Sequence, residues 1–176
     1  MGTGYTLGCK KCGYKISGNL GVGFFFPKAY QETMRAAREG KLGKRIQRFL
    51  EEHPDGALKA ETVFLQCEEC GKLTCGMDLS MYIRNPEMPR KEHGRWSVAM
   101  PFEEEDYVSP MELEDEGTYQ FYDYGNLCEK CGKPMKPITD NELMDNNARD
   151  ENDGSTVVTC PRCKERLWIE DIIMWD

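Results

Sequence analysis

The chain contains few histidines, and the two that it has are far apart. They are His53 and His93, in a sequence of 176 residues. The sequence therefore gives little support to a catalytic site in which a histidine, oriented by an acidic residue, activates a serine or cysteine nucleophile. A catalytic zinc ion has little support either, because it keeps an open position beside histidine or carboxylate ligands. We therefore expect a binding role and no catalysis.

Long apolar runs are also lacking. The longest span only a few residues, such as residues 23–27, and a membrane-spanning helix needs about 20. We therefore expect no membrane partner. The beginning of the sequence has no charged region followed by a long apolar stretch, so we expect no secretory signal and a cytoplasmic location, where thiols stay reduced.

Charge is unevenly distributed along the chain. The 23 basic and 31 acidic residues give a net charge of −8. Residues 1–60 hold eleven basic and five acidic residues, whereas residues 61–176 hold twelve basic and twenty-six acidic ones. The whole molecule is thus repelled by nucleic acid at long range, although a local basic face can still bind it.

Seven basic residues of the N-terminal part recur in a predicted helical region. They are Lys28, Arg35, Arg38, Lys41, Lys44, Arg45 and Arg48. A phosphate-binding face for nucleic acid is one interpretation. The other is an ordinary solvated helix that pairs with acidic residues of the same chain, and we favour it because acidic residues are so numerous.

Cysteine is abundant and patterned. Eight of the nine cysteines form four CxxC pairs, and Cys75 stands apart. A CxxC turn places two thiolates at adjacent corners of a tetrahedron, so two turns complete the shell that structural zinc prefers. A glycine follows three of the pairs, and Lys164 follows the last. The predicted metal ligands are Cys9, Cys12, Cys67, Cys70, Cys128, Cys131, Cys160 and Cys163.

These motifs resemble the zinc-ribbon class, in which two rubredoxin-like CxxC knuckles clasp one zinc ion. The resemblance covers residues 5–16 with 63–79, and residues 119–135 with 156–170. It implies that the eight paired cysteines hold two structural zinc ions. Four knuckles can pair in three ways, and we predict sequential pairing, the first with the second and the third with the fourth, because it closes the shortest loops.

Two other uses of the cysteines stay open. A redox dithiol of the thioredoxin kind needs a helix that begins at the motif, and here strands and glycines follow. Iron also accepts four thiolates, so a rubredoxin-like electron carrier is an alternative to a zinc protein. Against it, rubredoxins are compact, and the long insertions of this chain would have no explanation.

The coarse pattern predicts an α+β protein made of two small β-rich zinc ribbons. The first ribbon, residues 1–83, carries a helical insertion with helices near residues 27–39 and 42–52. An acidic, proline-containing linker covers residues 84–117, and the second ribbon covers residues 118–176. Residues 139–155, rich in Asp, Asn and Glu, are expected to form a solvated loop.

The segment 172–175 is apolar in an otherwise polar chain. We expect these residues to dock onto the protein's own C-terminal ribbon, although a patch for a partner is the alternative. The predicted role of the whole chain is that of an adaptor or regulatory protein that presents surfaces to another macromolecule. The partner is expected to be a protein, with nucleic acid as the competitor.

Overall fold

The computed structural model describes residues 2–22, 26–89, 107–115, 117–148 and 158–175. The fold is α+β, as predicted, and the chain divides into two compact units. Three segments form unit 1, residues 1–24, 61–79 and 124–176. Unit 2 consists of residues 25–60 and 80–123. This division differs from the expected series of ribbon, linker and ribbon, because each unit combines segments that are distant in the sequence.

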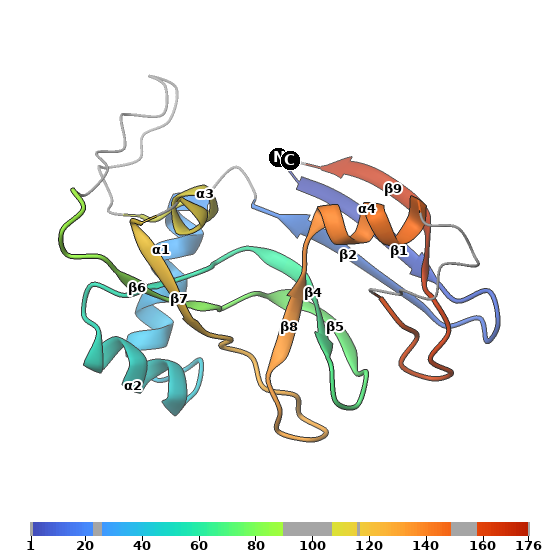
Figure 1. Cartoon of the computed structure of the whole chain (residues 1–176), viewed down its shortest axis with the longest axis horizontal. Coiled ribbons are helices and arrows are strands. Elements are labelled where there is room, and N and C mark those ends of the chain that lie inside the picture. The colour runs from blue at the N-terminus through green and yellow to red at the C-terminus, as the bar shows by residue number, and fades with distance from the viewer. Residues whose placement is uncertain (1, 23–25, 90–106, 116, 149–157, 176) are drawn as a thin grey trace. The chain divides into compact units, whose positions relative to one another are not determined.

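Unit 1 is built on a six-stranded sheet in which all pairings are antiparallel (Figure 1). Its main path runs in the order β5-β4-β2-β1-β9, and β8 pairs with β4 off this path. The strands are β1 (Gly2–Gly8), β2 (Lys15–Gly21), β4 (Thr62–Cys67), β5 (Leu73–Met77), β8 (Met135–Ile138) and β9 (Trp168–Trp175). Strands of this sheet flank the first and second knuckles, and β9 follows the fourth.

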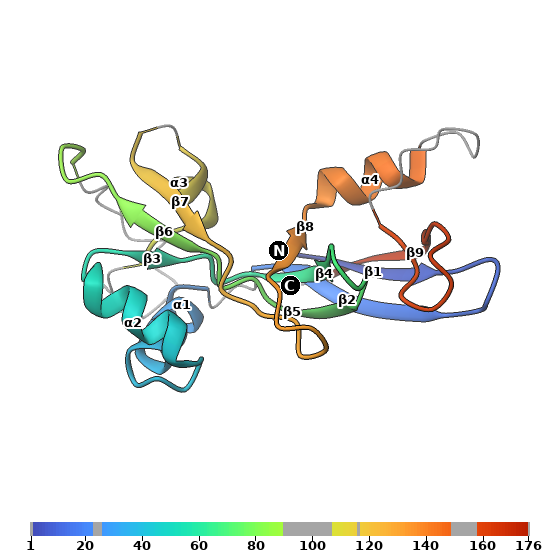
Figure 2. The same ribbon diagram turned by 60° about the horizontal axis from the view of Figure 1, so that its bottom comes forward.

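A helix, α4 (Asp140–Ala148), covers one face of this sheet (Figure 2). It lies where a solvated loop was expected for residues 139–155, so that prediction is wrong for the first half of the segment; residues 149–157 lie outside the described part. Leu143, only 1% exposed, packs into the core with Tyr5, Leu7 and Phe64. Burial of this one face supplies the free energy that orders an otherwise polar helix.

Unit 2 combines helices with a three-stranded sheet. Its helices are α1 (Phe26–Arg38), α2 (Lys44–Glu52) and the short α3 (Pro110–Glu114). Its strands are β3 (Ala57–Leu58), β6 (Met81–Arg84) and β7 (Tyr119–Asp123), in the order β3-β6-β7. The two predicted helices of the insertion are confirmed. Of the expected linker, residues 84–89, 107–115 and 117 belong to this unit, and residues 90–106 lie outside the described part.

The apolar spacing of α1 and α2 explains the core of unit 2. Tyr30, Met34 and Ala37 recur on one face of α1 and are buried. Ile46, Phe49 and Leu50 do the same on α2, and the Phe49 ring lies 5.1 Å from that of Tyr122 on β7. The two helices thereby pack against the three-stranded sheet (Figure 2).

Candidate metal centres

All four CxxC segments adopt the same local hydrogen-bonded turn. In each, the backbone N–H of the residue after the second cysteine donates to the carbonyl of the first, at 2.7–3.0 Å. The N–H of the first cysteine donates in turn to the carbonyl five residues later, at 2.7–2.9 Å. The turn is therefore fixed by the backbone, and it holds both sulfurs of a knuckle on one side.

The residue after the second cysteine has a positive φ in every knuckle. Gly13, Gly71 and Gly132 have φ of 69°, 72° and 72°, values that glycine adopts at no steric cost. Lys164 takes the same conformation with φ of 65°. The fourth knuckle, which departs from the glycine pattern in the sequence, therefore has the same backbone geometry as the other three.

The eight paired cysteines come together as two groups of four. The outer cysteine group contains Cys9, Cys12, Cys160 and Cys163, and the inner cysteine group contains Cys67, Cys70, Cys128 and Cys131. The predicted sequential pairing is therefore wrong. The second and third knuckles pair with each other inside the loop that the first and fourth close, and both groups belong to unit 1.

The geometry of each group suits a metal ion. The four sulfurs of a group lie within 4.8 Å of one another. Between knuckles, Cys9 and Cys163 are 3.4 Å apart in the outer group, and Cys67 and Cys131 are 3.4 Å apart in the inner group. A tetrahedral ion with metal–sulfur bonds of about 2.3 Å requires sulfurs about 3.8 Å apart, so small shifts close the shell. Both groups can hold a metal ion.

Burial is asymmetric within each group. Cys9 and Cys160 are buried in the outer group, as are Cys67 and Cys128 in the inner group. These four side chains also pack into the apolar clusters of unit 1. Cys12 and Cys131 are exposed. A metal ion in either group would therefore link the core of the sheet to the surface turns.

Ion pairs join the two knuckles of each group. Lys11 Nζ lies 2.6 Å from Glu165 in the outer group, and Lys72 Nζ lies 2.6 Å from Glu129 in the inner group. These pairs are mostly exposed, so solvent screening leaves them only a small contribution to stability. Lys164 Nζ additionally donates to the Cys70 carbonyl at 2.7 Å and so connects a knuckle of the outer group to one of the inner group.

The thiols of a group differ in acidity. A backbone N–H from Cys12 holds the pKa of Cys9 at about 7. Burial opposes ionisation of Cys128, but N–H groups of its own knuckle outweigh burial and lower its pKa to about 6. Cys131 also accepts a backbone hydrogen bond, yet burial and the neighbouring sulfurs raise its pKa to about 12. The same causes raise the pKa of Cys163 to about 12.

Cys75 belongs to neither group. It lies on β5, opposite Phe64 of β4, and its sulfur fills the space beside Gly18. Burial raises its pKa, which disfavours the thiolate. This supports a packing role.

The seven basic residues predicted as a nucleic-acid surface lie on α1, on α2 and between them. Six of these side chains are exposed to solvent. The seventh, Arg45, is half-buried and forms an ion pair with Asp123. Lys41 lies 2.5 Å from Glu39, and Lys28 lies 4.0 Å from Glu32. Acidic residues of the same chain therefore partly neutralise the surface.

Comparisons with known proteins identify no family for this chain. No family model matches the chain, and the searches of curated proteins and of solved structures found no match. Among the described residues, every helix is too short or too polar to cross a membrane.

Sequence reasoning identified the eight cysteines but missed the strand pairings of β1 with β9 and of β4 with β8, which bring the knuckles together. Lys11 in the first knuckle complements Glu165 beside the fourth, and Lys72 beside the second complements Glu129 in the third. The charges of the knuckles gave no clear signal, because Lys10 and Lys11 in the first knuckle also complement Glu68 and Glu69 in the second.

Proposed function

We propose that each cysteine group holds one structural zinc ion and that the chain is a non-catalytic adaptor or regulatory protein that binds another protein. Four thiolates complete the tetrahedral shell of zinc and leave no position for a substrate. The observation that carries the binding role is the outer edge of β9, which is long, apolar and exposed.

β9 offers a template for strand addition. It pairs with β1 along Gly2 to Gly8, and no other described strand pairs with its outer edge. The C-terminal segment was predicted to dock onto the C-terminal ribbon, and this prediction is wrong, because the segment pairs through its backbone with β1 of the predicted first ribbon.

The side chains of this segment stay accessible. Ile172, Ile173 and Met174 are 47%, 52% and 74% exposed. Two N–H groups of β9, those of Ile169 and Ile172, already donate to the side chains of Asn147 and Asp171. An edge strand with exposed apolar side chains is nevertheless a recurring docking site for an extended segment of another protein.

Charged substitutions on this edge test the binding role. In Met174→Lys and Ile172→Lys, a lysine on the edge disfavours addition of another strand. We expect a protein that co-purifies with the wild-type chain after cross-linking in the native host to be lost from both variants. Met111→Lys is the matched control, because Met111 is 75% exposed but lies on α3 of unit 2. Equal recovery with all variants would refute the role of β9, and self-association would show that the occupant is a second copy.

Metal analysis tests the zinc assignment and its iron alternative. Protein purified without added metal should contain two zinc ions per chain and should not absorb visible light. An iron tetrathiolate would give a coloured protein, and this outcome would support the rubredoxin-like electron carrier.

Nucleic-acid binding through α1 and α2 is the second candidate. It is favoured by the accessibility of Lys28, Arg35, Arg38, Lys41, Lys44 and Arg48, none of which is buried. A gel-shift titration at several salt concentrations distinguishes it from the adaptor role. Binding that weakens steeply with salt and is lost in Lys44→Gln/Arg48→Gln would support the nucleic-acid role.

A further inference from the structure

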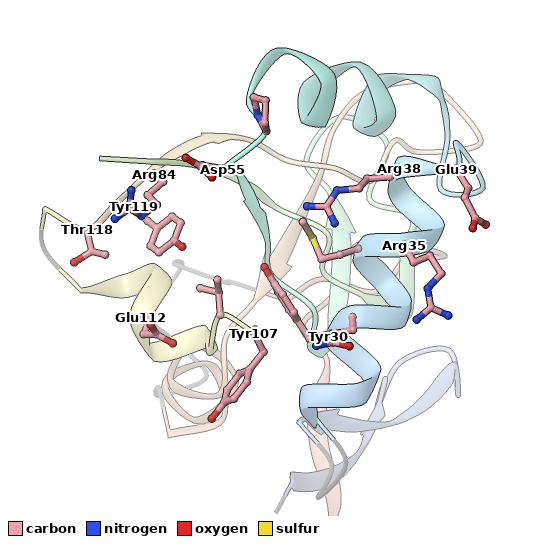
Figure 3. Close-up of a pocket in the computed structure, with 15 residues that line it drawn as sticks. Tyr30, Arg35, Arg38, Glu39, Asp55, Arg84, Tyr107, Glu112, Thr118 and Tyr119 are labelled. Carbon is pink, nitrogen blue, oxygen red and sulfur yellow. The ribbon is translucent and has the colours of Figure 1, made fainter. Parts of the chain in front are cut away.

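Unit 2 contains a pocket that neither cysteine group nor the edge of β9 uses. Its volume is about 480 Å³, within the range of small-ligand sites. The walls come from α1, the turn after α2, the end of β6, residues 107–108, α3 and the start of β7 (Figure 3). Short elements from four parts of the sequence therefore converge on one hollow.

Basic side chains reach into the pocket from two sides. Arg38 extends from α1 toward its middle, and Arg84 lies on the opposite side, whereas Arg35 points away (Figure 3). A hydrogen bond of 2.5 Å to the Met88 carbonyl holds the Arg84 guanidinium in place. The Arg38 guanidinium has no hydrogen bond or ion pair with any residue that the structure describes. Its planar fork of donors matches a phosphate or a carboxylate.

All three acidic residues of the wall have interaction partners. Glu112 accepts a hydrogen bond of 2.8 Å from the Ser109 N–H and so closes the capping box of α3. Glu39 lies 2.5 Å from the ammonium of Lys41 and points away from the pocket (Figure 3). Asp55, the third acid, also has an interaction partner. Because none of these acids pairs with the Arg38 guanidinium, an anionic ligand group is favoured beside Arg38.

Aromatic rings complete the wall. Tyr30 extends from α1 toward the middle, and Tyr119 faces it from the start of β7 (Figure 3). Tyr107 and Tyr119 are half-buried, so each presents part of its ring to the pocket. Tyrosine rings stack on planar heterocycles, including the bases of nucleotides. A ligand with a planar ring and one anionic group matches both kinds of wall.

We propose that this pocket binds a nucleoside monophosphate, with the phosphate held by Arg38 and Arg84 and the base stacked on tyrosine. The proposal is independent of the adaptor role, because the pocket lies in unit 2 and β9 lies in unit 1.

Calorimetric titration of the zinc-loaded full chain tests the proposal. The probes are AMP, UMP, adenosine and inorganic phosphate. We expect AMP or UMP to bind with a dissociation constant below about 1 mM, because the phosphate accepts hydrogen bonds from an arginine and the base stacks on a tyrosine. Adenosine and inorganic phosphate should each bind at least about tenfold more weakly, since each lacks one of the two groups.

Variants separate a built site from diffuse charge. Arg38→Gln and Arg38→Lys should weaken binding of the nucleotide at least about tenfold, because both remove the guanidinium fork and the second keeps the charge. Arg48→Gln is the control, since Arg48 is an arginine of α2 outside the pocket. Circular dichroism and zinc content confirm that each variant folds. Absence of nucleotide binding at about 1 mM, or equal weakening in Arg48→Gln, would overturn the proposal.

Discussion

Asn146 is a buried polar residue on which three segments of unit 1 depend. Its side chain is 3% exposed, and its amide nitrogen donates to the Leu167 carbonyl at 2.8 Å. Its amide oxygen accepts from the Val158 N–H at 3.3 Å. α4 is thereby tied to the chain on both sides of the fourth knuckle. Buried backbone groups left without a partner would cost more than the bonds themselves contribute.

Replacing this amide should therefore weaken unit 1. Asn146→Ala is expected to lower the free energy of unfolding by about 1–3 kcal/mol, since a buried N–H and a buried carbonyl lose their partner. Urea unfolding of the metal-loaded protein measures the change. Asn141→Ala is the matched control on the same helix, because Asn141 is exposed. Equal effects of the two substitutions would contradict the importance of the buried bonds.

The acidity of the cysteines predicts how metal binding depends on pH. The lowered pKa values of Cys9, about 7, and Cys128, about 6, favour their thiolates in the folded chain. This contribution is present above the pKa of an unfolded thiol and is lost as the pH falls through these values. Cys131 and Cys163 have a raised pKa of about 12 and keep their protons until a metal ion displaces them.

Zinc binding at pH 7 should consequently release protons from both groups. Calorimetry of zinc added to metal-depleted protein, in buffers with different ionisation enthalpies, measures this release. We expect at least about one proton per ion at pH 7 and weaker zinc binding as the pH is lowered toward about 5. A binding heat that does not depend on the buffer would contradict the raised pKa values.

At the scale of elements, α4 shows how a polar sequence still forms a helix. Thr139 and Glu142 form a capping box, in which the Glu142 N–H donates to Thr139 Oγ1 at 3.2 Å. Glu142 in turn accepts from the Thr139 N–H at 2.8 Å. Leu143 and Asn146 then share one buried face at a spacing of three residues. The composition of residues 139–155 suggested a loop, but the cap and the buried face decide the structure.

Removal of the cap should destabilise this element. Thr139→Ala is expected to lower the free energy of unfolding by about 1 kcal/mol. The Glu142 N–H loses its acceptor, Thr139 Oγ1, and the Glu142 carboxylate loses the hydroxyl that helps to hold it at the helix start. Denaturant unfolding, with hydrogen exchange of the α4 amides, measures the change in free energy. Glu142→Gln keeps an acceptor at the same position and should cost less. A larger loss in Glu142→Gln than in Thr139→Ala would contradict the capping account.

At the scale of the whole molecule, the pairing of the knuckles is set by the sheet. The sequential pairing would close loops of 54 and 28 residues, whereas the observed pairing closes loops of 57 and 147 residues. The extra loop-closure entropy amounts to only about 1.5 kcal/mol. Seven paired positions between β1 and β9 bring the first and fourth knuckles together, and four between β4 and β8 do so for the second and third. These ladders outweigh the entropy of the longer loops.

Double substitutions distinguish the two pairings directly. Cys12→Ser/Cys163→Ser removes two ligands of one observed group, so the chain should keep about one zinc ion. Cys12→Ser/Cys70→Ser removes one ligand from each group and should weaken both sites. Sequential pairing predicts the reverse. Elemental analysis after dialysis against a weak chelator measures the zinc content, and the reverse pattern would contradict the observed groups.

The sequence by itself determined the local features of this protein. The CxxC spacing and the glycines that follow three of the pairs specify the knuckle turn, because the turn needs only a few neighbouring residues and a positive φ. The 3.6-residue apolar spacing of α1 and α2 likewise predicted two helices and their buried faces.

Only the tertiary structure decided which parts of the chain meet. The pairing of Cys9 and Cys12 with Cys160 and Cys163 depends on β1 and β9, whose contact is invisible to local spacing. The same holds for the pocket of unit 2, which Arg38 and Arg84 line from opposite sides although they are 46 positions apart in the sequence. Contacts of this kind follow from strand register and the burial of apolar faces, which are properties of the assembled sheets and not of any one segment.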